Sequence, residues 1–132
     1  MVRKVVCAGT FDHFHPGHIE FLRQAKAMGD ELTVIVARDE TVLRIKGFLP
    51  THTEKERLNN VADTGIPDLV VLGNLDADLF QILQELRPDV IALGYDQRVS
   101  EEEVLKRFPG CSVVRLTPYK PEKYKSSFYR SR

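Results

Sequence analysis

VRKVVCAGTFDHFHPGH, residues 2–18, is the stretch that decides the fold. Its first part, Val2 to Ala8, is apolar and β-branched, which is typical of a central strand in a parallel sheet covered on both faces. After the turn, Pro16 stands at about the first position of a helical pattern, where its missing N–H costs nothing. A second strand-like run follows at Glu31 to Ala37, so this part of the chain predicts a βαβ unit with a right-handed crossover.

The alternation of strand and helix continues beyond this unit. Helical periodicity predicts helices at 54–63, 77–86 and 101–108. Apolar runs predict strands between and after them, at 68–73, 89–94 and 111–116. Gly29 stands where a helix C-cap is expected, and Thr53 with Glu56 matches a capping box. Residues 38–51 have no clean period, and we expect a functional loop or lid there.

These elements predict an α/β fold, a Rossmann-like doubly wound parallel sheet of five strands with the 2–8 run at its centre. A length of 132 residues fits one domain. We therefore expect residues 1–132 to form a single domain that ends in a basic tail at 117–132.

The charge balance gives the whole chain no general attraction to nucleic acid or anionic membrane, since 19 Lys and Arg residues match 19 Asp and Glu residues. The C-terminal part is nevertheless basic, which suggests local phosphate contact. Cys7 and Cys111 lie in apolar runs and suit buried free thiols in a reducing compartment. No apolar run approaches the ~20 residues that a membrane span needs, so we expect a cytoplasmic protein with no membrane and no nucleic-acid partner.

The turn itself predicts an anion site. His15 and His18 flank Pro16 and Gly17 at a helix N-terminus, where backbone N–H groups and the helix dipole favour phosphate. Thr10 adds a hydroxyl and an N–H, and the spacing matches neither a P-loop nor a dinucleotide-binding glycine motif.

Two other interpretations of the turn stay open at this point. The histidines could be ordinary cap and core residues. His13, His15 and His18 could also hold a metal, although no cysteine or carboxylate repeats at a spacing that would complete a zinc site.

The string GTFDHFHPGH resembles the GTFDxxHxGH motif of the cytidylyltransferase-like nucleotidyltransferases. Further matches make the chain similar to archaeal-type FAD synthases within that family, namely VARDETV, the IKG segment that leads to Pro50, DVIALG followed by Tyr95–Asp96–Gln97, and the paired serines near the end. The resemblance implies an FMN adenylyltransferase, in which the phosphate of FMN attacks the α-phosphorus of ATP with a divalent metal and no covalent enzyme intermediate.

The resemblance also implies roles for single residues. It places the backbone of Thr10 and Phe11 and the turn from His15 through Pro16 and Gly17 to His18 on the nucleotide phosphates, with both histidines stabilising the transition state. It implies that Lys46 reaches the acceptor phosphate and that Arg57 supports the triphosphate, against the alternative that both form a solvated basic surface. Nucleotide contacts are implied for Asp96, Tyr119, Ser126 and Ser127 as well.

The serine match departs from the family pattern, because Phe128 stands where threonine is usual. Either the phosphate-binding helix that begins at these serines is truncated, or direct contacts from Arg130 and Arg132 replace it, or the activity is weak. No protein metal ligand is implied, and Mg²⁺ is expected to arrive on the nucleotide phosphates.

Three functions remain in competition. The first is FMN adenylyl transfer, and the second is cytidylyl or adenylyl transfer from CTP or ATP to glycerol 3-phosphate, a sugar phosphate or another small phosphate. The third is a non-catalytic nucleotide-binding module. The sequence does not give the oligomeric state, although a homodimer is common among enzymes that resemble this chain.

Overall fold

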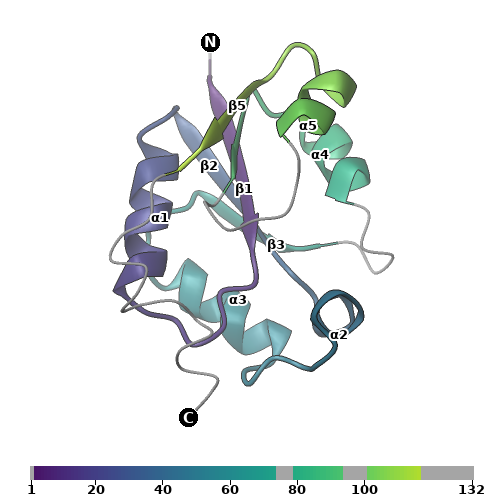
Figure 1. Ribbon diagram of the computed structural model, residues 1–132. Coiled ribbons are helices and arrows are strands. Elements are labelled where there is room, and N and C mark those ends of the chain that lie inside the picture. The colour runs from purple at the N-terminus through teal and green to yellow at the C-terminus, as the bar shows by residue number, and fades with distance from the viewer. Residues whose placement is uncertain (1, 74–78, 94–100, 117–132) are drawn as a thin grey trace.

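A computed structural model describes residues 2–73, 79–93 and 101–116, without the side chains of residues 79 and 80. Its centre is a parallel sheet of 5 strands in the order β3-β2-β1-β4-β5 (Figure 1). The strands are β1 (Lys4–Gly9), β2 (Glu31–Val36), β3 (Leu69–Leu72), β4 (Val90–Leu93) and β5 (Ser112–Arg115). The prediction that the first strand is central is confirmed.

Helices cover both faces of the sheet, as a doubly wound fold requires. They are α1 (Pro16–Lys26), α2 (Asp39–Lys46), α3 (Glu54–Ala62), α4 (Leu79–Leu86) and α5 (Glu101–Arg107). Figure 1 shows α1 and α3 on one side and α4 and α5 on the other. The sequence order β1–β2–β3 runs in one direction, and the chain then returns past β1 to β4, so the order reverses between β1 and β4.

The alternation along β1 divides the core into two layers. Val5 and Cys7 pack with residues of α1 and α3 in one buried cluster, and Val6 packs with residues of α4 and α5 in the other. Because both faces of β1 are buried, the strand must be apolar at every core position. This requirement explains the continuous apolar run from which the fold was predicted.

The segment predicted as a loop or lid at 38–51 contains a helix, and that expectation is corrected. Helix α2 buries only Val42, so its sequence DETVLRIK shows no apolar stripe that a periodicity argument could detect. Gly47, at φ 85°, ends the helix in the left-handed conformation that glycine adopts at least cost. Its start is capped from another helix, because the Asp39 N–H donates to Glu54 Oε1 at 2.9 Å.

Gly29 does not cap α1, and that expectation is also corrected. The C-cap is Ala27, whereas Gly29 allows two segments to approach: a Cβ there would lie 2.7 Å from the Arg3 carbonyl oxygen. By contrast, the predicted capping box of α3 is confirmed, since the Glu56 N–H donates to Thr53 Oγ1 and the Thr53 N–H donates to Glu56 Oε1.

Both cysteines are free thiols. Cys7 is fully buried in β1, and Cys111 is half-buried just before β5, where its Sγ lies 2.9 Å from the Pro88 carbonyl oxygen. Within the described ranges, every helix is too short or too polar to cross a bilayer.

Candidate functional site

The loop from Thr10 to His15 joins the carboxyl end of β1 to the N-terminus of α1, beside the point where the strand order reverses. In doubly wound folds, ligands bind at this point, outside the strand ends. The loop is tightly turned, because Phe11 and His13 adopt φ angles of 57° and 50°. Such angles cost a non-glycine residue about 1–2 kcal/mol, so the surrounding contacts must hold them in place.

Phe11 supplies one of those contacts. Its ring is buried and packs on Gly9, where a Cβ would lie 2.9 Å from Phe11 Cε2. Gly9 therefore serves a close approach between backbone and ring, and the turn depends on it.

The two histidines of the turn are bound to the protein through the same ring nitrogen. His15 is the N-cap of α1, and its Nδ1 accepts from the Gly17 N–H at 3.1 Å. The Nδ1 of His18 accepts from the His15 N–H at 3.3 Å. A nitrogen that accepts a hydrogen bond carries no proton, so the neutral form of each ring is assigned its proton on Nε2.

The same rings are stacked and neutral. The His15 and His18 centroids lie 3.9 Å apart at 25°, and Phe14 stacks on His18 at 5.3 Å. Burial lowers the pKa of His15 to about 4, with a further contribution from His13. Burial, then the neighbouring His15, lowers the pKa of His18 to about 3. At neutral pH the turn thus presents two uncharged imidazoles at a helix N-terminus.

Asp12 holds the turn against a distant segment. Its carboxylate is 1% exposed and accepts from the Thr51 N–H at 2.8 Å and the His52 N–H at 3.0 Å. The sequence argument gave Asp12 no role, although it stands inside the motif. No local pattern marks Asp12 for this role, because its partners lie 39 and 40 residues further along the chain.

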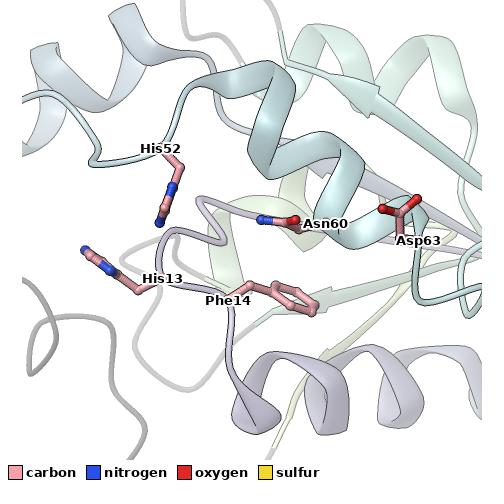
Figure 2. Close-up of a pocket in the computed structure, with 5 residues that line it drawn as sticks. All are labelled: His13, Phe14, His52, Asn60 and Asp63. Carbon is pink, nitrogen blue, oxygen red and sulfur yellow. The ribbon is translucent and has the colours of Figure 1, made fainter.

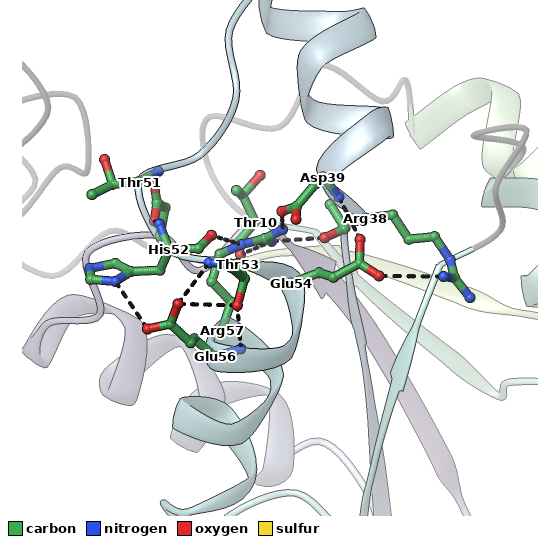
Figure 3. Close-up of polar contacts among 11 residues, drawn as sticks. Thr10, Arg38, Asp39, Thr51, His52, Thr53, Glu54, Glu56 and Arg57 are labelled. Atoms are coloured by element: carbon green, nitrogen blue, oxygen red, sulfur yellow. Dashed lines mark hydrogen bonds and ion pairs between the residues drawn. The ribbon is translucent and has the colours of Figure 1, made fainter.

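Arg57 is enclosed by the fold, and its role toward the nucleotide stays a prediction. Its side chain is 0% exposed, which corrects the interpretation of Arg57 as a solvated surface residue. Its guanidinium donates to the backbone oxygens of Thr10 at 2.8 Å, Ala37 at 2.7 Å and His52 at 3.0 Å. It also pairs with Asp39 Oδ1 at 2.6 Å (Figure 3). These contacts tie together the ends of β1 and β2, the start of α2 and the segment before α3.

Of the other predicted site residues, the structure describes Pro16 and Lys46. Pro16 is the first residue of α1, and Lys46 is the exposed last residue of α2. Asp96, Tyr119, Ser126 and Ser127 lie outside the described residues, so their roles stay predictions.

A cavity of about 460 Å³ opens between this loop and α3. Its lining consists of aromatic and polar side chains: His13, Phe14, His52, Asn60 and Asp63. Figure 2 shows Asn60 and Asp63 along α3, with the two histidines at the other end and Phe14 below Asn60. Sequence periodicity did not predict this cavity, because its lining comes from two separate segments.

In the described ranges, no group of three His, Cys, Asp or Glu side chains is arranged to hold a metal ion. The alternative that His13, His15 and His18 form a zinc site therefore receives no support. The rings of His15 and His18 are engaged in stacking and in α1 capping.

Comparison with known proteins gives a consistent set of similarities. A model of the cytidylyltransferase-like family matches residues 6–132. The FAD synthase of Methanosarcina barkeri is 49% identical over 117 residues, which cover 86% of this chain and 82% of that protein. The FAD synthase of Archaeoglobus profundus is 46% identical over 132 residues, which cover 96% and 82%.

A solved structure is similar in both fold and sequence. It is described as the lipopolysaccharide core biosynthesis protein from Thermoplasma volcanium GSS1, and it superposes with a TM-score of 0.84 at 35% identity. The match covers 91% of this chain and 100% of that one.

Proposed function

This chain belongs to the cytidylyltransferase-like family, as its GTFDHFHPGH turn predicted, and on that premise we propose that it transfers AMP from ATP to FMN. The products are FAD and pyrophosphate. Its similarity to several FAD synthases at 42–49% identity supports the choice of FMN over other phosphate acceptors.

The observation that carries the proposal is the orientation of the histidine pair. With both Nδ1 atoms accepting backbone N–H groups, His15 and His18 each carry the proton on Nε2. These N–H groups would donate to non-bridging oxygens of the α- and β-phosphates, together with backbone donors at the start of α1. Because the rings are neutral, they act as fixed hydrogen-bond donors and not as cations or proton acceptors.

The reaction balances without a protein base. A terminal phosphate oxygen of FMN supplies the electron pair that forms the new bond to the α-phosphorus of ATP. The bond from that phosphorus to the oxygen bridging to the β-phosphate breaks, and pyrophosphate leaves. A phosphate monoester has a second pKa near ~6, so the attacking oxygen is already ionised at neutral pH. The protein therefore contributes positioning and charge stabilisation, as is typical of phosphoryl-group chemistry.

We assign no described residue as a metal ligand and expect Mg²⁺ to enter bound to the ATP phosphates. When bound, the ion would neutralise charge on the phosphate oxygens. Lys46, at the end of α2, would meet the phosphate of FMN. Asp96, Tyr119, Ser126 and Ser127 are proposed nucleotide contacts on the strength of the family resemblance. For Arg57 we propose an indirect contribution, because its donors are bound to protein oxygens that shape the turn.

The direct test incubates the pure protein with Mg²⁺, ATP and FMN and follows FAD by chromatography. Formation of FAD supports the proposal. Parallel reactions pair ATP or CTP with glycerol 3-phosphate, a sugar phosphate or FMN. Turnover only with a non-flavin acceptor would move the chain to another transferase activity, and nucleotide binding without any product would indicate a non-catalytic module.

We further propose that residues 1–132 act as one domain, that the protein works in the cytoplasm, and that it forms a homodimer. Exposed apolar side chains on α2, Leu43 at 46% and Ile45 at 60%, offer a surface that a second copy could cover. Size-exclusion chromatography with light scattering will give the mass of the protein in solution. Replacing Ile45 with Glu should then lower the measured mass from that of a dimer toward that of a monomer.

A further inference from the structure

The cavity between α3 and the loop after β1 is separate from the place where the nucleotide is expected. A nucleotide in a doubly wound fold binds where the strand order reverses, which here is between β1 and β4. The cavity opens on the other side of the loop, since α3 packs on β2 and β3. The phosphate turn therefore stands between the expected nucleotide position and this cavity.

The side chains of the cavity suit a flat ring with polar edges. Phe14, His13 and His52 provide three aromatic surfaces, and the two imidazoles meet edge to face at 5.5 Å. Asn60 adds an amide that can donate and accept, and Asp63 adds an acceptor. The cavity is open to solvent, with Asn60 and Asp63 both exposed, and its volume of about 460 Å³ lies in the range of small-molecule sites, about 300–1,000 Å³.

The charges of the cavity argue against a phosphate there. Among the described residues that line it there is no lysine or arginine, and Asp63 contributes a carboxylate. Its histidines also lie beside acids, with His13 Nε2 at 3.9 Å from Asp12 and His52 Nδ1 at 3.8 Å from Glu56. A neutral ring is favoured over an anionic group in such surroundings.

We propose that this cavity holds the isoalloxazine ring of FMN, with the ring stacked on Phe14 and its polar edge bonded to Asn60. The assignment rests on the proposed function for the identity of the acceptor. Phe14 connects the two spaces, because the same ring that lines the cavity stacks on His18. A flavin on Phe14 would thus be anchored beside the phosphate turn, and its phosphate could extend along the loop toward the histidine pair.

Two neighbouring asparagines on α3 provide a matched test. Asn60 lines the cavity and Asn59 does not, although both residues are exposed. Both are replaced with Ala, and thermal unfolding verifies that each variant is folded. The probe is riboflavin, which carries the ring but no phosphate, and binding is read from the quenching of its fluorescence. Initial rates then give KM for FMN and for ATP separately.

We expect Asn60→Ala to weaken riboflavin binding and raise KM for FMN by about fivefold to tenfold, the loss that one hydrogen bond accounts for. Its KM for ATP and its kcat should stay within twofold of the wild type, and Asn59→Ala should match the wild type in every measurement. Asp63→Asn should give a smaller change in the same direction, because the amide keeps one acceptor.

Three results would overturn the assignment. The first is unchanged riboflavin binding in both Asn60→Ala and Asp63→Asn. The second is an increase in KM for ATP in place of FMN, which would give the cavity to adenine. The third is an equal effect of Asn59→Ala. If the wild-type protein forms no FAD but binds riboflavin in an Asn60-dependent way, the ring site stands and the proposed transferase activity falls.

Discussion

Two polar regions meet at the carboxyl end of the sheet and use their side chains in opposite ways. The histidine pair at the start of α1 is half-buried and neutral, and each ring is fastened to the backbone by Nδ1. The buried clamp, which we define as Arg57 and Asp12, is charged and almost fully enclosed, at 0% and 1% exposure. Both regions fix the same loop, since Arg57 binds the Thr10 carbonyl and Asp12 binds the segment before α3.

The difference indicates which charges serve the fold and which groups serve the chemistry. The guanidinium of Arg57 has donors on four protein oxygens, and the carboxylate of Asp12 accepts two backbone N–H groups. The charges of Arg57 and Asp12 therefore hold backbone segments together. In the proposed function, the ATP phosphates are recognised by the neutral imidazoles and the helix N-terminus, where orientation matters more than charge.

The largest effect should come from breaking the buried clamp. Arg57→Ala removes four hydrogen bonds and leaves three carbonyl oxygens and Asp39 without this partner, so we expect a loss of about 3–5 kcal/mol of unfolding free energy. Urea denaturation followed by circular dichroism measures it. Arg23→Ala, on the exposed side of α1, is the matched control and should change stability by less than about 0.5 kcal/mol. A loss below about 1 kcal/mol for Arg57→Ala would show that the clamp is dispensable.

The second prediction separates the two nitrogens of His18. His18→Ala should lower kcat at least a hundredfold, the usual effect of removing a well-placed donor. His18→Asn should lower kcat equally, although its amide oxygen can replace Nδ1 as the acceptor for the His15 N–H. The stability of His18→Asn should therefore stay closer to that of the wild type than the stability of His18→Ala does. A loss of less than threefold in kcat for both variants would remove His18 from the mechanism.

The same comparison shows what the sequence could predict. The central position of β1, the capping box of α3 and the helix start at Pro16 all follow from local patterns of apolar residues, glycine, proline and caps. Helix α2 does not, because it buries only Val42 and is held at its start by Glu54 from another helix. A contact of that kind leaves no periodic trace in the sequence.

Within the site, the motif predicted the histidine pair but not the clamp. His15 and His18 are three residues apart and can be recognised together in the chain. Arg57 meets Thr10 across 47 residues, and Asp12 meets His52 across 40 residues, so neither partner could be read from spacing. The family resemblance implied a place near the triphosphate for Arg57, whereas its burial depends on how three backbone segments converge.

A third prediction uses pH to distinguish the regions. Unfolded histidines titrate near ~6.5, whereas the folded pKa values of His15 and His18 are lowered to about 4 and about 3. Below pH ~6.5 the unfolded chain therefore binds protons that the folded chain does not, and stability falls as the pH is lowered from ~6.5 toward 4. Above pH 7 these two groups contribute no pH dependence.

Urea midpoints measured between pH 7.5 and pH 5 test this expectation. The wild-type protein should lose stability across that window, and His18→Asn should show a shallower slope because one depressed histidine is gone. The window stays above the range in which Glu56 and Asp68 titrate, whose pKa values are lowered by hydrogen bonds from Thr53 and Lys26 respectively. Identical slopes in the two proteins would mean that His18 is not held neutral by the fold.

The smallest effect should come from a charge that belongs to neither region. Lys46 is exposed at the end of α2, and a solvated ammonium that meets the acceptor phosphate adds binding but little to the transition state. Lys46→Ala should therefore raise KM for FMN about threefold to tenfold with kcat and stability nearly unchanged. Lys55→Ala, on the exposed first turn of α3, is the matched control and should leave KM unaltered. A fall in kcat with constant KM would place Lys46 with the histidine pair, since only a group that acts in the transition state lowers turnover in that way.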